Sequence, residues 1–116
     1  MIMKRQILFR GWSELHNKWV EGNFTYDAIG GSRIIKTDSS GQGLTFIPVH
    51  PDSVGQFTGE IDINGVKVFE GDIDEDGSFV EYSNGSFILT DKETSQYVFI
   101  GDCDFIEITG NTFQPK

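Results

Sequence analysis

Turn signals that contain glycine recur about every ten residues along this chain, and they separate short runs of alternating apolar and polar residues. The pairs Asn64-Gly65, Asp76-Gly77 and Asn84-Gly85 are typical of tight hairpin turns, because asparagine and glycine tolerate a positive φ. Alternation with a period of two places every second side chain on one face of a strand. A chain interrupted this often leaves no room for long helices, so short antiparallel strands are expected throughout.

The alternation predicts the following strands: residues 6–10, 18–26, 32–37, 44–48, 66–73, 79–82, 87–89, 97–100 and 105–108. One short helical or 3₁₀ turn is predicted between His50 and Gln56. No window has the pattern of an amphipathic helix longer than about two turns. The expected fold class is therefore mainly β.

The chain is expected to form a single domain with two lobes. Its 116 residues include 10 phenylalanines, and 37% of them are hydrophobic, which is enough to form a core. Residues 1–50 are expected to form an N-terminal β-hairpin lobe. Residues 51–116 are expected to form a small SH3-like barrel lobe, because hairpins at regular spacing are typical of small barrels.

The acidic residues are concentrated in the second half of the chain. The net charge is -9, yet residues 1–59 carry +1 and residues 60–116 carry -10. Residues 60–82 alone carry -7. A surface this acidic repels phosphate, so nucleic acid is not an expected partner.

Cysteine and hydropathy patterns point to one compartment. The single cysteine, Cys103, excludes an intramolecular disulfide and a thiolate zinc site, and it fits the reducing cytoplasm. Residues 1–5 lack the apolar stretch of a signal peptide, and no apolar run approaches the roughly 18 residues of a membrane span. We expect a cytoplasmic protein with no cofactor and no membrane partner.

Two separated runs carry a family resemblance. Residues 53–59 read Ser-Val-Gly-Gln-Phe-Thr-Gly, and Phe-Glu-Gly-Asp-Ile follows at residues 69–73; residues 5–11, 19–22 and 107–111 fit the same pattern. The combination resembles the YopX family of small phage and prophage proteins over nearly the whole chain. The resemblance implies a β-rich fold and a phage or prophage origin, and it carries no established activity. The chain departs from the family where Asp74-Glu75-Asp76 follows, since members often have a less acidic strand there.

A partner-binding surface is predicted at the two family-like runs. The predicted residues are Gln56, Phe57, Glu70 and Asp72. Gly55 and Gly59 flank Gln56 and Phe57, so a sharply bent segment would present these two side chains. The other interpretation of these residues is that they form turns that determine the fold, with Asp72 capping a neighbouring turn.

Asp72, Asp74 and Asp76 precede Gly77 with the spacing that opens a calcium-binding loop. Such a loop ends in a bidentate glutamate six residues after the glycine, but that position holds Ser83. Alternate residues of a strand also share one face, so an exposed acidic hairpin explains the spacing equally well. Weak calcium binding by these three aspartates is one hypothesis, and the solvated hairpin is the other.

No complete catalytic set is present in the sequence. His16 and His50 are the two histidines, and no Gly-x-Ser-x-Gly elbow accompanies them. Acidic neighbours on both sides of Cys103 disfavour a thiolate nucleophile. We therefore expect no enzymatic activity.

The expected function is a non-enzymatic protein-interaction module of a phage or prophage that acts in the bacterial host cytoplasm. Its partner is an unidentified protein or a second copy of the chain, because exposed strand edges favour association. The alternative is an acidic mimic of nucleic acid that binds a basic host or phage protein.

Overall fold

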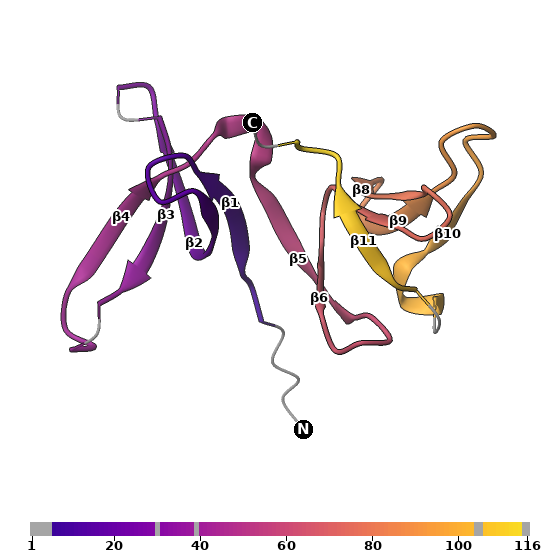
Figure 1. Cartoon of the computed structure of the whole chain (residues 1–116), viewed down its shortest axis with the longest axis horizontal. Helices are drawn as coiled ribbons and strands as arrows, with labels where there is room; N and C mark the ends of the chain where they lie inside the picture. The colour runs from indigo at the N-terminus through magenta and orange to yellow at the C-terminus, as the bar shows by residue number, and fades with distance from the viewer. Residues whose placement is uncertain (1–5, 30, 39, 104–105, 115–116) are drawn as a thin grey trace. The chain divides into compact units, whose positions relative to one another are not determined.

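The computed structural model describes residues 6–29, 31–38, 40–103 and 106–114, and strands dominate this part of the chain (Figure 1). It divides into two compact units, one formed by Gln6–Gln56 and the other containing Phe57–Lys116. The mainly β fold with two lobes that the sequence predicts is confirmed. No helix in the described ranges is long and apolar enough to span a membrane.

Four antiparallel strands build the first unit, in the order β4-β3-β2-β1. They are β1 (Phe9–Ser13), β2 (Lys18–Asp27), β3 (Gly31–Thr37) and β4 (Leu44–Pro48). The long strand β2 pairs with β1 through residues 18–22 and with β3 through residues 23–27. The 3₁₀ turn η1 (Pro51–Ser53) follows β4, and the first two residues of β5 (Gly55–Ile61) then pair with β1.

The first strand begins three residues later than predicted, at Phe9. The reason is its partner: β1 pairs with β2 over its full length, and Trp12 lies directly opposite Trp19. The two indole rings pack edge to face with centroids 5.5 Å apart, an arrangement that stabilises cross-strand pairs. The pairing with β2 therefore sets the bounds of β1.

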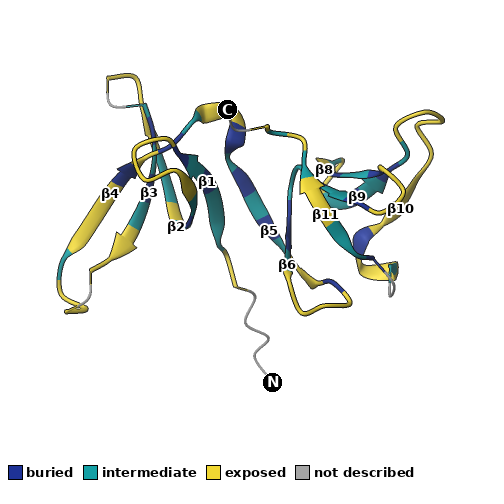
Figure 2. Ribbon diagram, viewed as in Figure 1, coloured by how far each residue is buried: buried dark blue, intermediate teal, exposed yellow. Residues whose placement is uncertain are grey.

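Alternating residues of these strands form the core of the first unit. It consists of Val20, Ile34, Ile47 and Val49, with Phe9, Phe24 and Val54 packed against them. Ser53 fixes the η1 turn, because its hydroxyl accepts the N–H of Trp12 at 2.7 Å and donates to the carbonyl of His50 at 2.6 Å. Figure 2 shows that the outermost strand, β4, is exposed along much of its length.

The second unit contains one hairpin and one five-stranded sheet. The later part of β5 pairs with β6 (Lys67–Phe69). The sheet has the strand order β10-β9-β8-β7-β11. Its strands are β7 (Asp72–Asp74), β8 (Phe79–Ser83), β9 (Ser86–Thr90), β10 (Tyr97–Phe99) and β11 (Ile108–Asn111), with the 3₁₀ turn η2 (Ile100–Asp102) after β10.

The sequence predicts a small SH3-like barrel for the second lobe; it is a β lobe, but its sheet does not close into a barrel. Closure requires the two outer strands of a sheet to pair, but β10 and β11 remain separate edges here. The strands are also short: β7 has three residues and meets β8 through the single pair Ile73 and Phe79. The predicted strand over residues 66–73 is divided at Gly71, which adopts a φ of 88°.

One face of the five-stranded sheet packs on the core of the second unit. The core consists of Val68, Val80, Ile100 and Ile106, with Phe87, Leu89, Cys103 and Ile108 packed against them. Val80 and Leu89 are cross-strand neighbours on this face. Because side chains alternate, their sequence neighbours Glu81 and Ile88 lie on the other face of the sheet.

Candidate functional site

Asp62 leads the turn between β5 and β6, where it is buried. Its Oδ1 accepts the N–H groups of Asn64 and Val66, each at 2.8 Å, and its Oδ2 accepts the N–H of Ile108 in β11 at 3.0 Å. Burial raises the pKa of Asp62, but the three N–H groups outweigh it and hold this pKa below its ordinary value. Of the predicted turn pair, only Gly65 has a positive φ, since Asp62 holds the turn through its side chain.

Asp74 leads the turn between β7 and β8 in the same way as Asp62. Its Oδ1 accepts the N–H groups of Asp76 at 3.0 Å and of Ser78 at 2.9 Å, and Gly77 adopts a φ of 82°. Here burial dominates, so the pKa of Asp74 is raised. Both turns share the pattern Asp-x-Asn/Asp-Gly, and hydrogen bonding within the turn accounts for that pattern without an ion.

Asp72 is 1% exposed and connects three segments of the second unit. Its Oδ2 accepts the N–H of Phe69 at 2.8 Å, and its Oδ1 accepts from the side-chain amide of Asn111 at 3.1 Å. The N–H of Thr112 donates to the carbonyl of Gly71 at 2.7 Å. Asp72 therefore acts as a buried cap that ties β11 to the turn between β6 and β7.

The three aspartates predicted as calcium ligands do not gather at one point. Asp72 and Asp74 are buried, so the alternative of a fully exposed acidic hairpin is wrong for these two residues. In the described part of the chain, three carboxylates come together only at Asp74, Glu75 and Asp76, whose ligand atoms lie within 4.8 Å of one another. Calcium binding stays a prediction, and Asp72 lies outside this group.

The predicted partner residues lie in strands and turns rather than in a bent, protruding segment. Phe57 is 7% exposed, and its ring centroid lies 5.5 Å from that of Phe69. Asp72 is buried, whereas Gln56 and Glu70 are half-buried. The segment between the two glycines belongs to β5, which has an irregularity near Gly59, where φ is 93°. Partner binding through these residues stays a prediction.

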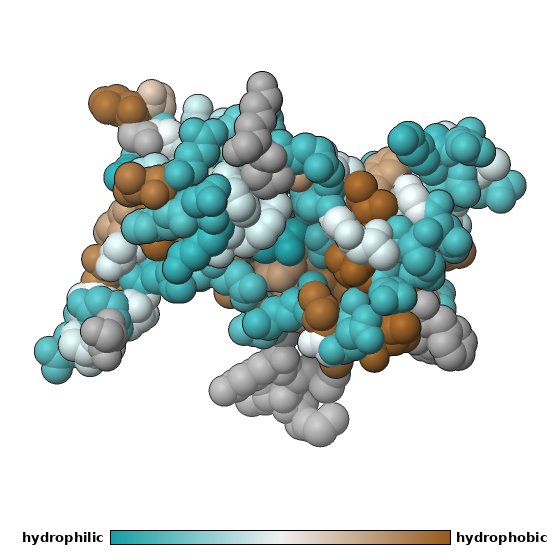
Figure 3. All heavy atoms as spheres, viewed as in Figure 1, coloured by the Kyte–Doolittle hydropathy of each residue, from teal (hydrophilic) through white to brown (hydrophobic). Residues whose placement is uncertain are grey.

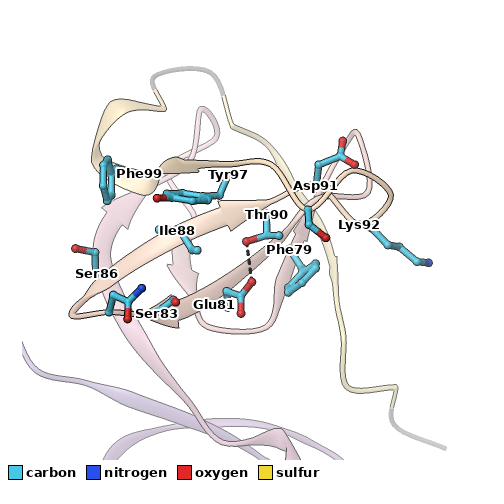
Figure 4. A pocket seen from close by; sticks show the side chains of 12 residues that line it. Phe79, Glu81, Ser83, Ser86, Ile88, Thr90, Asp91, Lys92, Tyr97 and Phe99 are labelled. Carbon is cyan, nitrogen blue, oxygen red and sulfur yellow. Dashed lines mark hydrogen bonds between the residues drawn. The ribbon is translucent and has the colours of Figure 1, made fainter.

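A cavity of about 450 Å³ opens on the outer face of β8, β9 and β10 (Figure 4). Two rows of cross-strand neighbours form it: Phe79, Thr90 and Tyr97 in one row, and Glu81, Ile88 and Phe99 in the other. The rest of the lining is polar and comes from the two hairpin turns: Ser83, Asn84, Ser86, Asp91, Lys92 and Ser95. In Figure 3 the surface of the loop between β9 and β10 is hydrophilic.

Two aromatic rings stand at the β10 side of the cavity. Tyr97 and Phe99 are 57% and 51% exposed, and their ring centroids lie 5.9 Å apart in an edge-to-face arrangement. They belong to a strand at the edge of the sheet. Exposed aromatic rings within a polar rim are characteristic of binding surfaces, since a partner removes the rings from water.

Glu81 contributes a carboxylate to the same cavity. It is half-buried, and its Oε2 accepts the hydroxyl of Thr90 at 2.7 Å (Figure 4). Glu81 forms no ion pair with any residue in the described ranges. Lys92 also lines the cavity, but its side chain extends away from Glu81 (Figure 4). The cavity thus combines aromatic rings, hydroxyl groups and the carboxylate of Glu81, which is paired with no cation among the described residues.

Fold and cavity together define a mainly β protein with two lobes and an open aromatic and acidic cavity in the second. The family model described as YopX protein matches residues 8–114. The chain therefore belongs to the YopX family, which confirms the resemblance in its sequence. Comparison with curated proteins and with solved structures finds no match.

Proposed function

We propose that this YopX-family protein is a non-enzymatic protein-interaction module that binds its partner through the outer face of β8, β9 and β10. The observation that carries the proposal is the cavity with two half-exposed aromatic rings. Its volume of about 450 Å³ lies within the range of binding pockets, and aromatic anchors supply much of the energy of protein interfaces. We propose further that the module acts in the cytoplasm of a bacterial host, in line with the phage or prophage origin that the family resemblance implies.

The lining of the cavity favours binding over catalysis. Neither a histidine nor a cysteine is among the lining residues. Its second carboxylate, Asp91, accepts the N–H groups of Glu93 at 2.8 Å and of Thr94 at 2.9 Å and so serves the hairpin turn. The hydroxyl that donates to Glu81 belongs to Thr90, which is buried. A buried hydroxyl is poorly placed to attack a substrate, so this lining supports the proposal of ligand recognition.

The partner is either another protein or a second copy of this chain. Both β4 and β10 are edge strands, and an edge strand can pair with another chain. The aromatic rings of β10 favour a partner at the second unit in either case. Nucleic acid is disfavoured, because residues 60–116 carry a charge of -10.

Affinity capture from a bacterial lysate tests the proposal with a matched pair of variants. The double variant Tyr97→Ser with Phe99→Ser removes both rings, and Tyr26→Ser removes a tyrosine of the first unit that is 66% exposed. We expect wild type and Tyr26→Ser to capture the same protein, and the double variant to retain at least about tenfold less. Equal capture by all three proteins contradicts the proposed face.

Two measurements make the outcome specific. Far-UV circular dichroism establishes that the double variant keeps the strand content of wild type. Light scattering detects a second copy as the partner: a wild-type dimer that becomes a monomer in the double variant assigns the face to self-association.

A further inference from the structure

We propose that the cavity receives an arginine side chain of the protein partner, stacked on Tyr97 and Phe99 and paired with the carboxylate of Glu81. This inference rests on the proposed function and specifies the chemistry that the partner must present. Three observations support it: the hydrogen bonding of Glu81, the rings of β10 on the same face of the sheet, and the acidic charge of residues 60–116.

Glu81 is a half-buried carboxylate that faces the cavity without a counter-ion in the described part of the chain. One hydroxyl, that of Thr90, donates to it. A carboxylate that is partly removed from water is stabilised by a charged donor, and a guanidinium can approach both of its oxygens with two parallel N–H groups. An arginine of the partner would therefore satisfy the acceptor capacity that Thr90 leaves open.

The rings of Tyr97 and Phe99 in β10 lie on the same face of the sheet as Glu81 in β8, with β9 between them (Figure 4). A planar, weakly hydrated guanidinium stacks on aromatic faces better than an ammonium does, so the combination favours arginine over lysine. The first unit already contains this contact twice: the guanidinium of Arg10 lies 4.3 Å from the ring centroid of Trp19, and that of Arg33 lies 5.6 Å from the centroid of Phe46.

The charge of residues 60–116 favours the same ligand at long range. Thirteen acidic residues and three lysines occupy residues 60–116. This excess attracts a basic segment before contact and speeds association, whereas it repels a phosphate-bearing ligand. The charge of residues 60–116 thus guides a basic peptide towards the cavity, and Glu81 with the two rings selects its arginine.

Nuclear magnetic resonance titration of the full-length ¹⁵N-labelled protein tests the inference. The probes are three short glycine-serine peptides that differ only in their two central residues. These are both arginine, both lysine, or both citrulline, which is a neutral isostere of arginine. We expect the arginine peptide to shift the amide signals of β8, β9 and β10 with saturation, the lysine peptide to bind several-fold more weakly, and the citrulline peptide to leave the signals unchanged.

A pair of charge-matched variants separates the cavity from the general acidity. Glu81→Gln keeps an acceptor for the Thr90 hydroxyl, so we expect the fold to be retained while affinity for the arginine peptide falls about tenfold. Glu60→Gln removes the same charge from an exposed residue outside the lining and should change the affinity less than about twofold. Equal weakening by the two variants, or binding of the citrulline peptide, overturns the inference.

The two proposals fail in different ways. If no peptide binds while capture of the cellular partner still requires Tyr97 and Phe99, the arginine inference is overturned and the interaction face stands. If capture is unchanged by the loss of both rings, the proposed function is overturned. If Glu60→Gln and Glu81→Gln weaken peptide binding equally, general acidic mimicry of nucleic acid replaces the cavity as the explanation.

Discussion

Asp62 and Asp74 perform the same task in turns of the same sequence pattern, yet their pKa values shift in opposite directions. Asp62 is buried, and three N–H groups lower its pKa, including one from Ile108 in a distant strand. Burial dominates at Asp74, where only two N–H groups oppose it and the charges of Glu75 and Asp76 raise the pKa further. The same turn pattern therefore has different electrostatic consequences, because β11 contributes a third donor at Asp62 and two neighbouring carboxylates act on Asp74.

This difference predicts opposite pH dependences for two variants. The folded-state pKa of Asp62 lies below 3.8, so its ionised form adds to the free energy of unfolding above pH 3.8, and this contribution is lost as the pH falls through the folded pKa. The folded-state pKa of Asp74 lies above 3.8, so its ionised form opposes folding, and protonation removes that cost as the pH falls towards 3.8.

We therefore expect the stability advantage of wild type over Asp62→Asn to shrink between about pH 7 and about pH 3, and wild type to gain relative to Asp74→Asn over the same interval. Urea unfolding of the three proteins at each pH measures both differences. Parallel pH dependences for the two variants would contradict the assignment of the two shifts.

At the scale of the element, strand β2 changes its partner in the middle. Gly22 is the last residue of β2 that pairs with β1, and Asn23 is the first that pairs with β3. A Cβ on Gly22 would overlap the carbonyl oxygen of Ile35 and would lie 2.9 Å from the Cγ2 of Ile34. Only glycine permits this close approach of two backbones at the point where the pairing changes.

Gly22→Ala should lower the free energy of unfolding by about 1–3 kcal/mol, since a backbone atom cannot move aside as a side chain can. Tryptophan fluorescence in urea reports this unit, because Trp12 and Trp19 lie in β1 and β2. The control is Gly110→Ala in β11, where a Cβ meets no atom within 4 Å. It should change stability by less than about 0.5 kcal/mol in urea melts followed by circular dichroism. A loss as large as that of Gly22→Ala would argue against the steric explanation.

At the scale of the whole molecule, the two halves of the chain differ in charge far more than in architecture. Residues 60–116 carry -10, whereas residues 1–59 carry +1. Three of the aspartates, Asp62, Asp72 and Asp74, are buried in turns and bonded there. The remaining acids repel one another across the surface of one unit, which destabilises its compact state.

Salt should therefore stabilise the second unit more than the first. Raising sodium chloride from about 0.1 M to about 1 M shortens the Debye length from about 10 Å to about 3 Å and screens this repulsion. We expect amide hydrogen-exchange protection to increase more in the strands after residue 57 than in the strands before it. The first unit is the internal control. An equal increase in protection in both units would show that salt stabilises the whole protein non-specifically, without a special effect on the acidic half.

The residue pattern predicts the strands of the candidate site, but it does not predict which face of the sheet stays open. A period of two shows that Glu81 and Phe79 share one face of a strand and that Val80 lies on the other. It does not show which face a neighbouring segment covers. That choice depends on Ile100 and Ile106, which pack on the Val80 face and leave the Glu81 face open. The cavity was therefore not predicted, whereas the strands that form it were.

The sequence by itself determined the mainly β class, the turn positions, the family and the unequal charge of the two halves. These properties depend on short-range chemistry: an Asp-x-Asn/Asp-Gly turn closes its hydrogen bonds within five residues. Tertiary structure decided that Asp72 is a buried cap and that the second lobe stays open. It also placed Tyr97, Phe99 and Glu81 around one cavity. These outcomes require strands far apart in the chain to pair and pack, and no local pattern of residues encodes which of them meet.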